Sequence, residues 1–176
     1  MNIEVELRSF ISEEKYEELL NFFRTEATFL GEDYQETFYF DSDQDLRIQR
    51  NNNGAKVWLK KGNLHDDHRE EIEMNVSKED FETLENLFRA LKYGVDIKWY
   101  RKRNTFHWQG ISIMLDNTLG YGYILELEKM STAEEKDDTL ALLRQKLSEL
   151  EIPLTPKEIF NERFEYYKEN WRELVP

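Results

Sequence analysis

The chain contains no cysteine among its 176 residues. This absence excludes disulfide frameworks, thiolate metal sites, cysteine nucleophiles and thiol redox chemistry. A protein with no use for oxidised thiols is most simply an intracellular one, and we expect it to be cytoplasmic.

Long apolar runs are also missing. No segment approaches the roughly 18 apolar residues that a membrane-spanning helix needs. The first residues lack a basic stretch followed by an apolar one, which a targeting segment would contain. We therefore expect a soluble protein with no membrane partner.

Positive charge is scarce. Lysine and arginine total 24 against 37 aspartates and glutamates, so the formal net charge is −13. This balance argues against a nucleic-acid partner, which would require a broad basic surface. A small phosphate ligand stays compatible with the sequence if the basic groups are concentrated in one place and metal ions offset the carboxylates.

The chain does contain enough apolar material for one core. Hydrophobic residues make up 39% of the sequence and aromatic residues 14%. A chain of 176 residues usually buries a single core. We predict one domain over residues 1–176, as a monomer or homodimer, with its last two helices (about 132–172) packing on the rest.

The first half of the chain alternates between strand and helix patterns. Residues 3–8 alternate strictly between apolar and charged side chains, which predicts a strand with one charged face. Ser12 precedes a helical stripe that runs to about residue 26. Four strands joined by short turns follow between residues 34 and 74, and Asn53-Gly54 suits a turn with positive φ.

The second half continues in the same way. Ser77 opens a second helix, with Asp80 at the capping-box position and Gly94 just past the end. Three strands are predicted near residues 96–108, 111–117 and 122–129, and the last two helices begin near the capping residues Thr132 and Thr155. The predicted order is therefore one strand, a helix, four strands, a helix, three strands and two helices.

Charged residues occupy one face of almost every predicted strand. The helices must cover the apolar strand faces to bury their own stripes, so the charged faces point the other way. Besides Glu4, Glu6 and Arg8, this face carries Arg47, Gln49, Lys56, Trp58, Lys60, Arg69, Glu71, Glu73, Arg101, Arg103, Ser112, Met114, Asp116, Glu126 and Glu128.

Two arrangements of these faces are open. In a flat sheet, solvent would cover them; in an eight-stranded sheet that closes, they would line an interior wide enough for one small ligand. Crowded charges must pair with each other or hold ions. Carboxylates favour Mg²⁺ or Mn²⁺, and arginine matches phosphate oxygens. We predict an α+β fold, a closed eight-stranded antiparallel β-barrel with helices outside, that binds the metal complex of a polyphosphate.

Six short motifs occur in a defined order along most of the chain. They are Glu4-Val5-Glu6-Leu7-Arg8, Tyr39-Phe40-Asp41 with Leu46-Arg47-Ile48, Lys60 at the end of Trp58-Leu59-Lys60, Arg69-Glu70-Glu71-Ile72-Glu73, Arg101-Lys102-Arg103, and Leu115-Asp116 with Leu119-Gly120 and Leu125-Glu126-Leu127-Glu128. In this order they resemble the CYTH superfamily, or triphosphate tunnel metalloenzymes, which includes class IV adenylyl cyclases, thiamine triphosphatases and inorganic tripolyphosphatases.

The resemblance implies a tunnel in which glutamates hold divalent metal and basic residues hold a triphosphate. The implied metal ligands for Mg²⁺ or Mn²⁺ are Glu4, Glu6, Asp116, Glu126 and Glu128. The implied catalytic residues are Glu4, Glu6, Lys60, Glu126 and Glu128. The implied substrate-binding residues are Arg8, Arg47, Lys56, Lys60, Arg69, Glu71, Glu73, Arg101 and Arg103.

Three positions depart from the motifs that the sequence resembles. Arg8 and Arg101 stand where lysines are expected, and Gln49 stands where a second arginine is expected. Because arginine stays protonated, Arg8 could bind phosphate but could not act as a general base. A proton-accepting lysine would have to be Lys60 or Lys56.

Three functions and one structural alternative fit these residues. Hydrolysis of an inorganic or organic triphosphate is favoured because it demands only water. A class IV-type adenylyl cyclase would use the same residues to make cyclic AMP and pyrophosphate. A non-catalytic module would bind polyphosphate or nucleotides without turnover. In the structural alternative, the charges form an ion-pair network that only stabilises the barrel.

Overall fold

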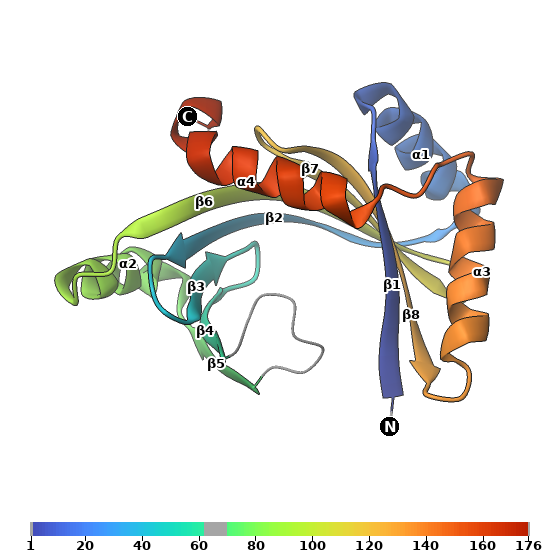
Figure 1. The fold of residues 1–176 in the computed structure, drawn as a ribbon. Helices are drawn as coiled ribbons and strands as arrows, with labels where there is room; N and C mark the ends of the chain where they lie inside the picture. The colour runs from blue at the N-terminus through green and yellow to red at the C-terminus, as the bar shows by residue number, and fades with distance from the viewer. Residues whose placement is uncertain (1, 62–69, 176) are drawn as a thin grey trace. The chain divides into compact units, whose positions relative to one another are not determined.

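The computed structural model describes residues 2–61 and 70–175, with the backbone alone at residues 2, 60, 61, 70 and 71. Its elements follow the predicted order (Figure 1). They are β1 (Asn2–Ile11), α1 (Glu13–Glu26), β2 (Thr28–Phe40), β3 (Asp45–Arg50), β4 (Ala55–Lys61), β5 (Glu70–Val76), the 3-10 turn η1 (Lys78–Asp80), α2 (Phe81–Ala90), β6 (Val95–Trp108), β7 (Ile111–Thr118), β8 (Gly122–Thr132), α3 (Lys136–Glu149) and α4 (Lys157–Leu174).

The strands form one eight-stranded antiparallel sheet in the order β1-β8-β7-β6-β2-β3-β4-β5. The α+β class and the eight antiparallel strands are thus confirmed. Hydrogen-bonded closure is not observed, because β1 and β5 end the sheet and no ladder joins them over the residues that the structure describes. Alternation in a sequence decides which face a side chain occupies, but it does not say which edge strands meet.

The chain forms two compact units. Unit 1 contains Met1–Glu32 and Lys102–Glu169, and unit 2 contains Asp33–Arg101 and Asn170–Pro176. Strands β2 and β6 and helix α4 each contribute residues to both units.

The core of unit 1 lies between the apolar sheet face and two helices. Its strand residues include Leu125 and Leu127 of β8, both fully buried. Helix α1 contributes Leu19 and Phe23, and α3 contributes Leu143. Both helices accompany β1 and β8 in Figure 1. The apolar side of these strands is therefore covered by helices, as the sequence pattern predicts.

The core of unit 2 is smaller and depends on aromatic contacts. Phe81 of α2 packs edge-on against Phe38 of β2, with ring centroids 5.1 Å apart. About two helical turns later, Phe88 packs in the same way against Phe40, with ring centroids 4.9 Å apart. These rings fix α2 on the apolar face of the strands, beside the fully buried Ile48.

The predicted helix starts and turns were right in part. The Ser12 hydroxyl accepts a hydrogen bond from Lys15 N at 3.1 Å, as an N-cap should. Ser77 forms no such cap; its hydroxyl bonds the Glu79 carboxylate, and the 3-10 turn precedes α2, so the capping box was wrong. Gly54 has no positive φ either. That turn is held by Asn51 Oδ1, which accepts from the backbone N–H groups of residues 53 and 54.

Gly94 has a different role from the predicted helix end. Lys92, with φ of 71°, adopts the left-handed conformation after α2. Gly94 instead permits a close approach, because a Cβ at this position would lie 2.8 Å from Asp41 Oδ2. The Gly94 N–H donates to the Asp41 carboxylate, and the Asp41 N–H donates to the Gly94 carbonyl. This reciprocal contact joins the end of β2 to the start of β6.

A threonine forms hydrogen bonds just before each of the last two helices. Thr132 Oγ1 accepts from Glu135 N at 3.3 Å and donates to its carboxylate at 3.2 Å, although α3 begins only at Lys136. Thr155 joins β1 instead: its hydroxyl accepts from Phe10 N at 2.9 Å, and its own N–H donates to Ser9 Oγ at 3.1 Å. Over the described residues, we find no helix whose length and apolarity together would suit a membrane crossing.

Candidate active site

The register of β1, β8 and β7 puts the predicted acidic residues of unit 1 on one face. Glu6 lies directly opposite Glu128, and Arg8 lies opposite Glu126. On the other side of β8, the same two glutamates face Ser112 and Met114 of β7. We call this surface the charged face of unit 1; it carries Glu4, Glu6, Arg8, Arg103, Asp116, Glu126 and Glu128.

Arg103 is the centre of the ionic contacts on this face. Its Nε and Nη2 atoms donate to the two carboxylate oxygens of Asp116, both at 2.7 Å, and Nη2 also donates to Glu126 at 3.2 Å. The Arg103 side chain is 19% exposed and that of Asp116 only 3%. Burial opposes the guanidinium charge, but the hydrogen bonds and charges of Asp116 and Glu126 outweigh it, so the pKa of Arg103 is raised. Arg103 therefore stays charged and orients both acids.

The carboxylates on this face are crowded. Burial raises the pKa of Glu126 above its ordinary value; Arg103 opposes this rise, while Glu6 and Asp116 add to it. Burial also raises the pKa of Glu128, and the nearby Glu4 and Glu6 raise it further. Like charges placed directly across a sheet repel each other. The face thus concentrates negative charge that a bound cation would offset.

The donor chemistry of the face fits a hard divalent cation. Carboxylate oxygens are the ligands that Mg²⁺ and Mn²⁺ prefer. Over the residues that the structure describes, no three acidic or histidine side chains converge closely enough to form a ready ligand group. Asp116 already uses both oxygens for Arg103, which favours Glu4, Glu6, Glu126 and Glu128 as donors. These side chains would have to turn toward a bound ion.

Arg8 is more accessible than Arg103, the other arginine of the charged face of unit 1. Its side chain is 53% exposed, and its guanidinium lies 3.5 Å from the Glu6 carboxylate. The same group lies 5.6 Å from the centre of the Phe160 ring, on α4. Phe160 stacks on Phe10 at 4.4 Å. Helical spacing in the sequence could not reveal the contact of Phe160 with Arg8.

Unit 2 has a corresponding charged face on β3, β4 and β5. Lys56 lies opposite Gln49 on one side and Asn75 on the other, and its ammonium is 2.8 Å from Glu73. The ammonium also lies 4.7 Å from the centre of the Trp58 ring. Lys56, Trp58 and Glu73 thus share this face, as their alternation predicts.

Arg47 is held more firmly than Lys56. Its Nε and Nη2 atoms each donate to an Asp45 oxygen at 2.5 Å, and its guanidinium lies 4.3 Å from the Tyr39 ring centre. A bidentate pair with an aromatic neighbour fixes the orientation of the guanidinium. Asp45 is a partner that the motifs did not predict.

The remaining predicted residues are only partly described. Arg101 donates from Nε and Nη2 to the side-chain oxygen of Gln35, within unit 2. The register places the Lys60 backbone opposite Asp45 and Glu71. The side chains of Lys60 and Glu71 and the whole of Arg69 lie outside the described residues.

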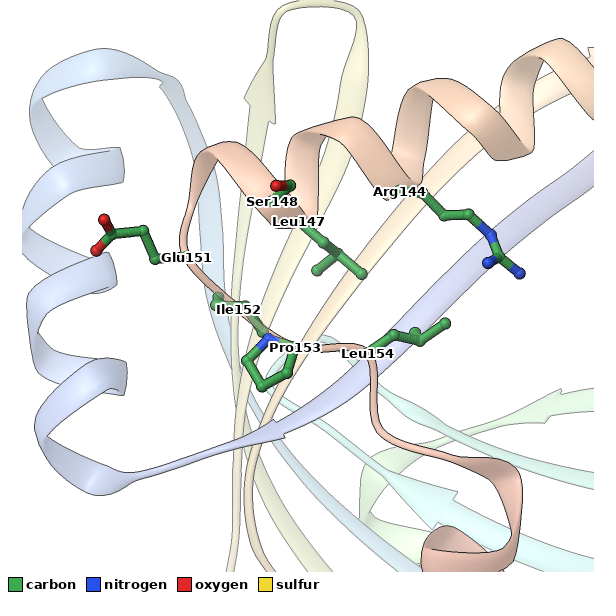
Figure 2. Close-up of a pocket in the computed structure, with 7 residues that line it drawn as sticks. All are labelled: Arg144, Leu147, Ser148, Glu151, Ile152, Pro153 and Leu154. Carbon is green, nitrogen blue, oxygen red and sulfur yellow. The ribbon is translucent and has the colours of Figure 1, made fainter.

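A separate cavity lies beside α3. It has a volume of about 420 Å³ and is formed by the last turns of α3 and the segment that follows, from Arg144 to Leu154 (Figure 2). It contains none of the acidic or basic residues of the charged face. This cavity is therefore separate from the predicted site.

Solved structures of similar fold come from several organisms. A conserved hypothetical protein from Pyrococcus furiosus has a TM-score of 0.65 at 23% identity, covering 86% of this chain and 92% of its own. An adenylyl cyclase-like protein from Hippeastrum, described as having a dominant triphosphatase activity, has a TM-score of 0.64 at 20% identity and covers 90% of this chain and 94% of its own. An adenylate cyclase-like protein from Bacillus halodurans has a TM-score of 0.62 at 17% identity, with 88% and 93% covered.

At these identities the structural likenesses establish the fold alone. No curated protein matches the sequence. The CYTH domain profile, however, matches residues 2–158, which is nearly the whole chain. The chain therefore belongs to the CYTH domain family.

Proposed function

We propose that this protein hydrolyses a triphosphate in a divalent-metal-dependent reaction at the charged face of unit 1. The observation that carries the proposal is the direct pairing of Glu6 with Glu128 across β1 and β8, with a second carboxylate, Glu126, one pair away. Such crowding is unfavourable for a purely structural sheet. It is useful where a cation and an anionic substrate bind together.

Glu4, Glu6, Glu126 and Glu128 are the residues that would hold Mg²⁺ or Mn²⁺. When bound, the metal would lower the pKa of an attacking water and offset negative charge on the phosphates. Arg103 would hold the Glu126 carboxylate in place through its hydrogen bond of 3.2 Å. Asp116 would act through Arg103, since both of its oxygens accept from the guanidinium.

Arg8 is proposed to bind a phosphate group. Its exposed guanidinium has a single long contact of 3.5 Å to Glu6 among the ion pairs of the described residues. A phosphate oxygen offers a stronger, charge-assisted partner and would replace that contact. The positive charge would then offset the charge that develops as the phosphoryl group transfers.

Glu128 is proposed to orient the attacking water and accept its proton. A carboxylate whose pKa is raised is the stronger base, and burial together with Glu4 and Glu6 raises the pKa of Glu128. Arg8 cannot take this role because arginine stays protonated. In unit 2, Lys56, which pairs with Glu73, and Arg47, which pairs with Asp45, stay predicted phosphate-binding residues.

A second candidate function is cyclisation of ATP. It is favoured by the descriptions of the Hippeastrum and Bacillus halodurans proteins as adenylyl cyclase-like. The same carboxylates and arginines would act, with the ribose hydroxyl replacing water as the nucleophile. Hydrolysis is preferred because the charged face of unit 1 provides for the phosphates and for water without any further group.

The two functions differ in their products. Purified protein would be incubated separately with tripolyphosphate, ATP and thiamine triphosphate, each with Mg²⁺ or Mn²⁺, and the products resolved by ³¹P NMR and chromatography. Orthophosphate release supports the hydrolase. Cyclic AMP with pyrophosphate would replace it by the cyclase, and binding with no product would indicate a non-catalytic module.

A further inference from the structure

The cavity at the end of α3, which we call the α3 cavity, has a preformed apolar floor. The Ile152 N–H donates to the Leu147 carbonyl at 2.9 Å, and the Glu151 N–H donates to the Ser148 carbonyl at 3.0 Å. Glu151, with φ of 57°, adopts the left-handed conformation that this kind of helix end requires. Leu147 and Ile152, the pair that often meets across such a turn, are 2% and 5% exposed and line the cavity.

The segment that leaves α3 is also fixed at its far end. Thr155 Oγ1 accepts from Phe10 N at 2.9 Å, and the Thr155 N–H donates to Ser9 Oγ at 3.1 Å, so the segment is attached to β1. Between these two anchors, Pro153 and Leu154 line the cavity (Figure 2). A lining that is ordered before a ligand arrives loses less conformational freedom on binding.

One cation accompanies these aliphatic side chains. Figure 2 shows the Arg144 side chain extending toward the side of the cavity that Leu154 forms, and the Glu151 side chain pointing away. No carboxylate of the described residues lies within ion-pair distance of Arg144, whereas Lys146 on the same helix pairs with Glu149 at 2.6 Å. The α3 cavity thus combines an aliphatic surface with one guanidinium that has no carboxylate partner among the described residues.

We propose that the α3 cavity binds a small aliphatic carboxylic acid, with its carboxylate on Arg144 and its chain against the aliphatic lining. An arginine fork matches the two oxygens of a carboxylate. The cavity volume of about 420 Å³ lies within the range of roughly 300–1,000 Å³ that is typical of small-molecule sites. Inorganic phosphate would leave the aliphatic lining uncovered, and a neutral hydrocarbon would leave Arg144 without a partner.

The test is an NMR titration that follows the backbone amide signals of the full chain. The ligands are octanoate, octan-1-ol, which keeps the chain without the charge, and acetate, which keeps the charge without the chain. They are added to the wild type, Arg144→Gln and Leu154→Ser; Leu154 is 40% exposed, so its replacement leaves the buried floor intact. Arg24→Gln is the matched control, because it removes an exposed arginine from α1 that does not line the cavity.

Octanoate should shift the signals of residues 147–154 with a dissociation constant of about 10 mM or tighter, and octanol and acetate should bind at least about 3-fold more weakly. Arg144→Gln should weaken octanoate binding about 3- to 10-fold and leave octanol binding unchanged, because only the ion pair is lost. Leu154→Ser should weaken the binding of both ligands, and Arg24→Gln should weaken neither.

The absence of a saturable octanoate shift at these residues would overturn the site. Octanol binding as tight as that of octanoate, or equal octanoate affinities in Arg144→Gln and Arg24→Gln, would overturn the choice of a carboxylate. The net charge of −13 repels anions in general, so saturable binding of octanoate would report a local site. No triphosphate is present in the titration, so its outcome is independent of the proposed function.

Discussion

Replacing Glu128 by glutamine should stabilise the metal-free protein. Glu128 lies directly opposite Glu6, and the change removes a like-charge pair while keeping the side chain's shape. Cross-strand pairs contribute about 0.2–1 kcal/mol, and repulsion between like charges has a similar size. For a chain of 176 residues, about 1 kcal/mol corresponds to about 2–4 °C in Tm, so we expect a rise of up to about 4 °C.

The effect of this substitution should depend on pH with a defined sign. Burial and the nearby Glu4 and Glu6 raise the folded-state pKa of Glu128. The charged carboxylate therefore costs stability above that raised pKa and costs nothing below the unfolded value of about 4.3. The advantage of Glu128→Gln should be present at about pH 7 and should disappear as the pH falls through the raised pKa.

Divalent metal should reverse the order of stability. A ligand at about 100 times its dissociation constant stabilises a folded protein by about 2.7 kcal/mol. The wild type should gain Tm on addition of Mn²⁺ in calorimetric scans, and Glu128→Gln should gain less. Glu134→Gln removes the same charge at an exposed turn and serves as the control. A lower metal-free Tm in Glu128→Gln, or equal gains from Mn²⁺ in the variant and the wild type, would refute the reasoning.

Three further predictions concern the ion pair, the β2–β6 contact and Phe160. Asp116→Asn leaves the partly buried Arg103 without its bidentate partner and should cost about 3 kcal/mol in urea unfolding. Arg103→Met with Asp116→Leu should recover most of this loss, and a loss below about 0.5 kcal/mol for the single variant would contradict the pairing. Gly94→Ala brings a Cβ to 2.8 Å from Asp41 Oδ2 and should lower the free energy of unfolding in urea by about 1–3 kcal/mol. The loss of stability should be smaller in an Asp41→Ala background, and equal losses in both backgrounds would show that the strain does not come from Asp41. Phe160→Ala removes the ring 5.6 Å from the Arg8 guanidinium and should raise the KM for a triphosphate about 2- to 5-fold while kcat stays unchanged. Phe160→Tyr should restore the wild-type KM. An unchanged KM in Phe160→Ala would show that the ring serves only in packing.

The strand faces could be predicted from the sequence because side chains in a strand alternate. The parity that places Glu6 and Arg8 on one face and Leu7 on the other is visible in residues 3–8 and is what the register shows. The same parity placed Lys56 and Glu73 together on β4 and β5. Local periodicity is enough for such statements, because neither depends on how distant elements meet.

Partners that are far apart in the sequence could not be predicted. The contact of Phe160 with Arg8 depends on how α4 meets β1, and that of Arg103 with Asp116 and Glu126 on three strands at once. The predicted hairpin turn at residues 51–54 forms, but the expected positive φ at Gly54 is not observed. The Asn51 side chain accepts from the backbone N–H groups of the turn instead. Hydrogen-bonded closure of the sheet was predicted but is not observed, because the alternation of side chains does not say which edge strands pair.

The central claim is that the paired glutamates of β1 and β8 support metal-dependent turnover of a triphosphate. Orthophosphate release from tripolyphosphate and ATP would be followed with Mn²⁺, with Mg²⁺ and with chelator, for the wild type, Glu6→Gln and the control Glu134→Gln. We predict turnover by the wild type and Glu134→Gln only with metal, and none by folded Glu6→Gln, which has lost one carboxylate of the Glu6–Glu128 pair. Turnover that persists in chelator or in Glu6→Gln would contradict the claim.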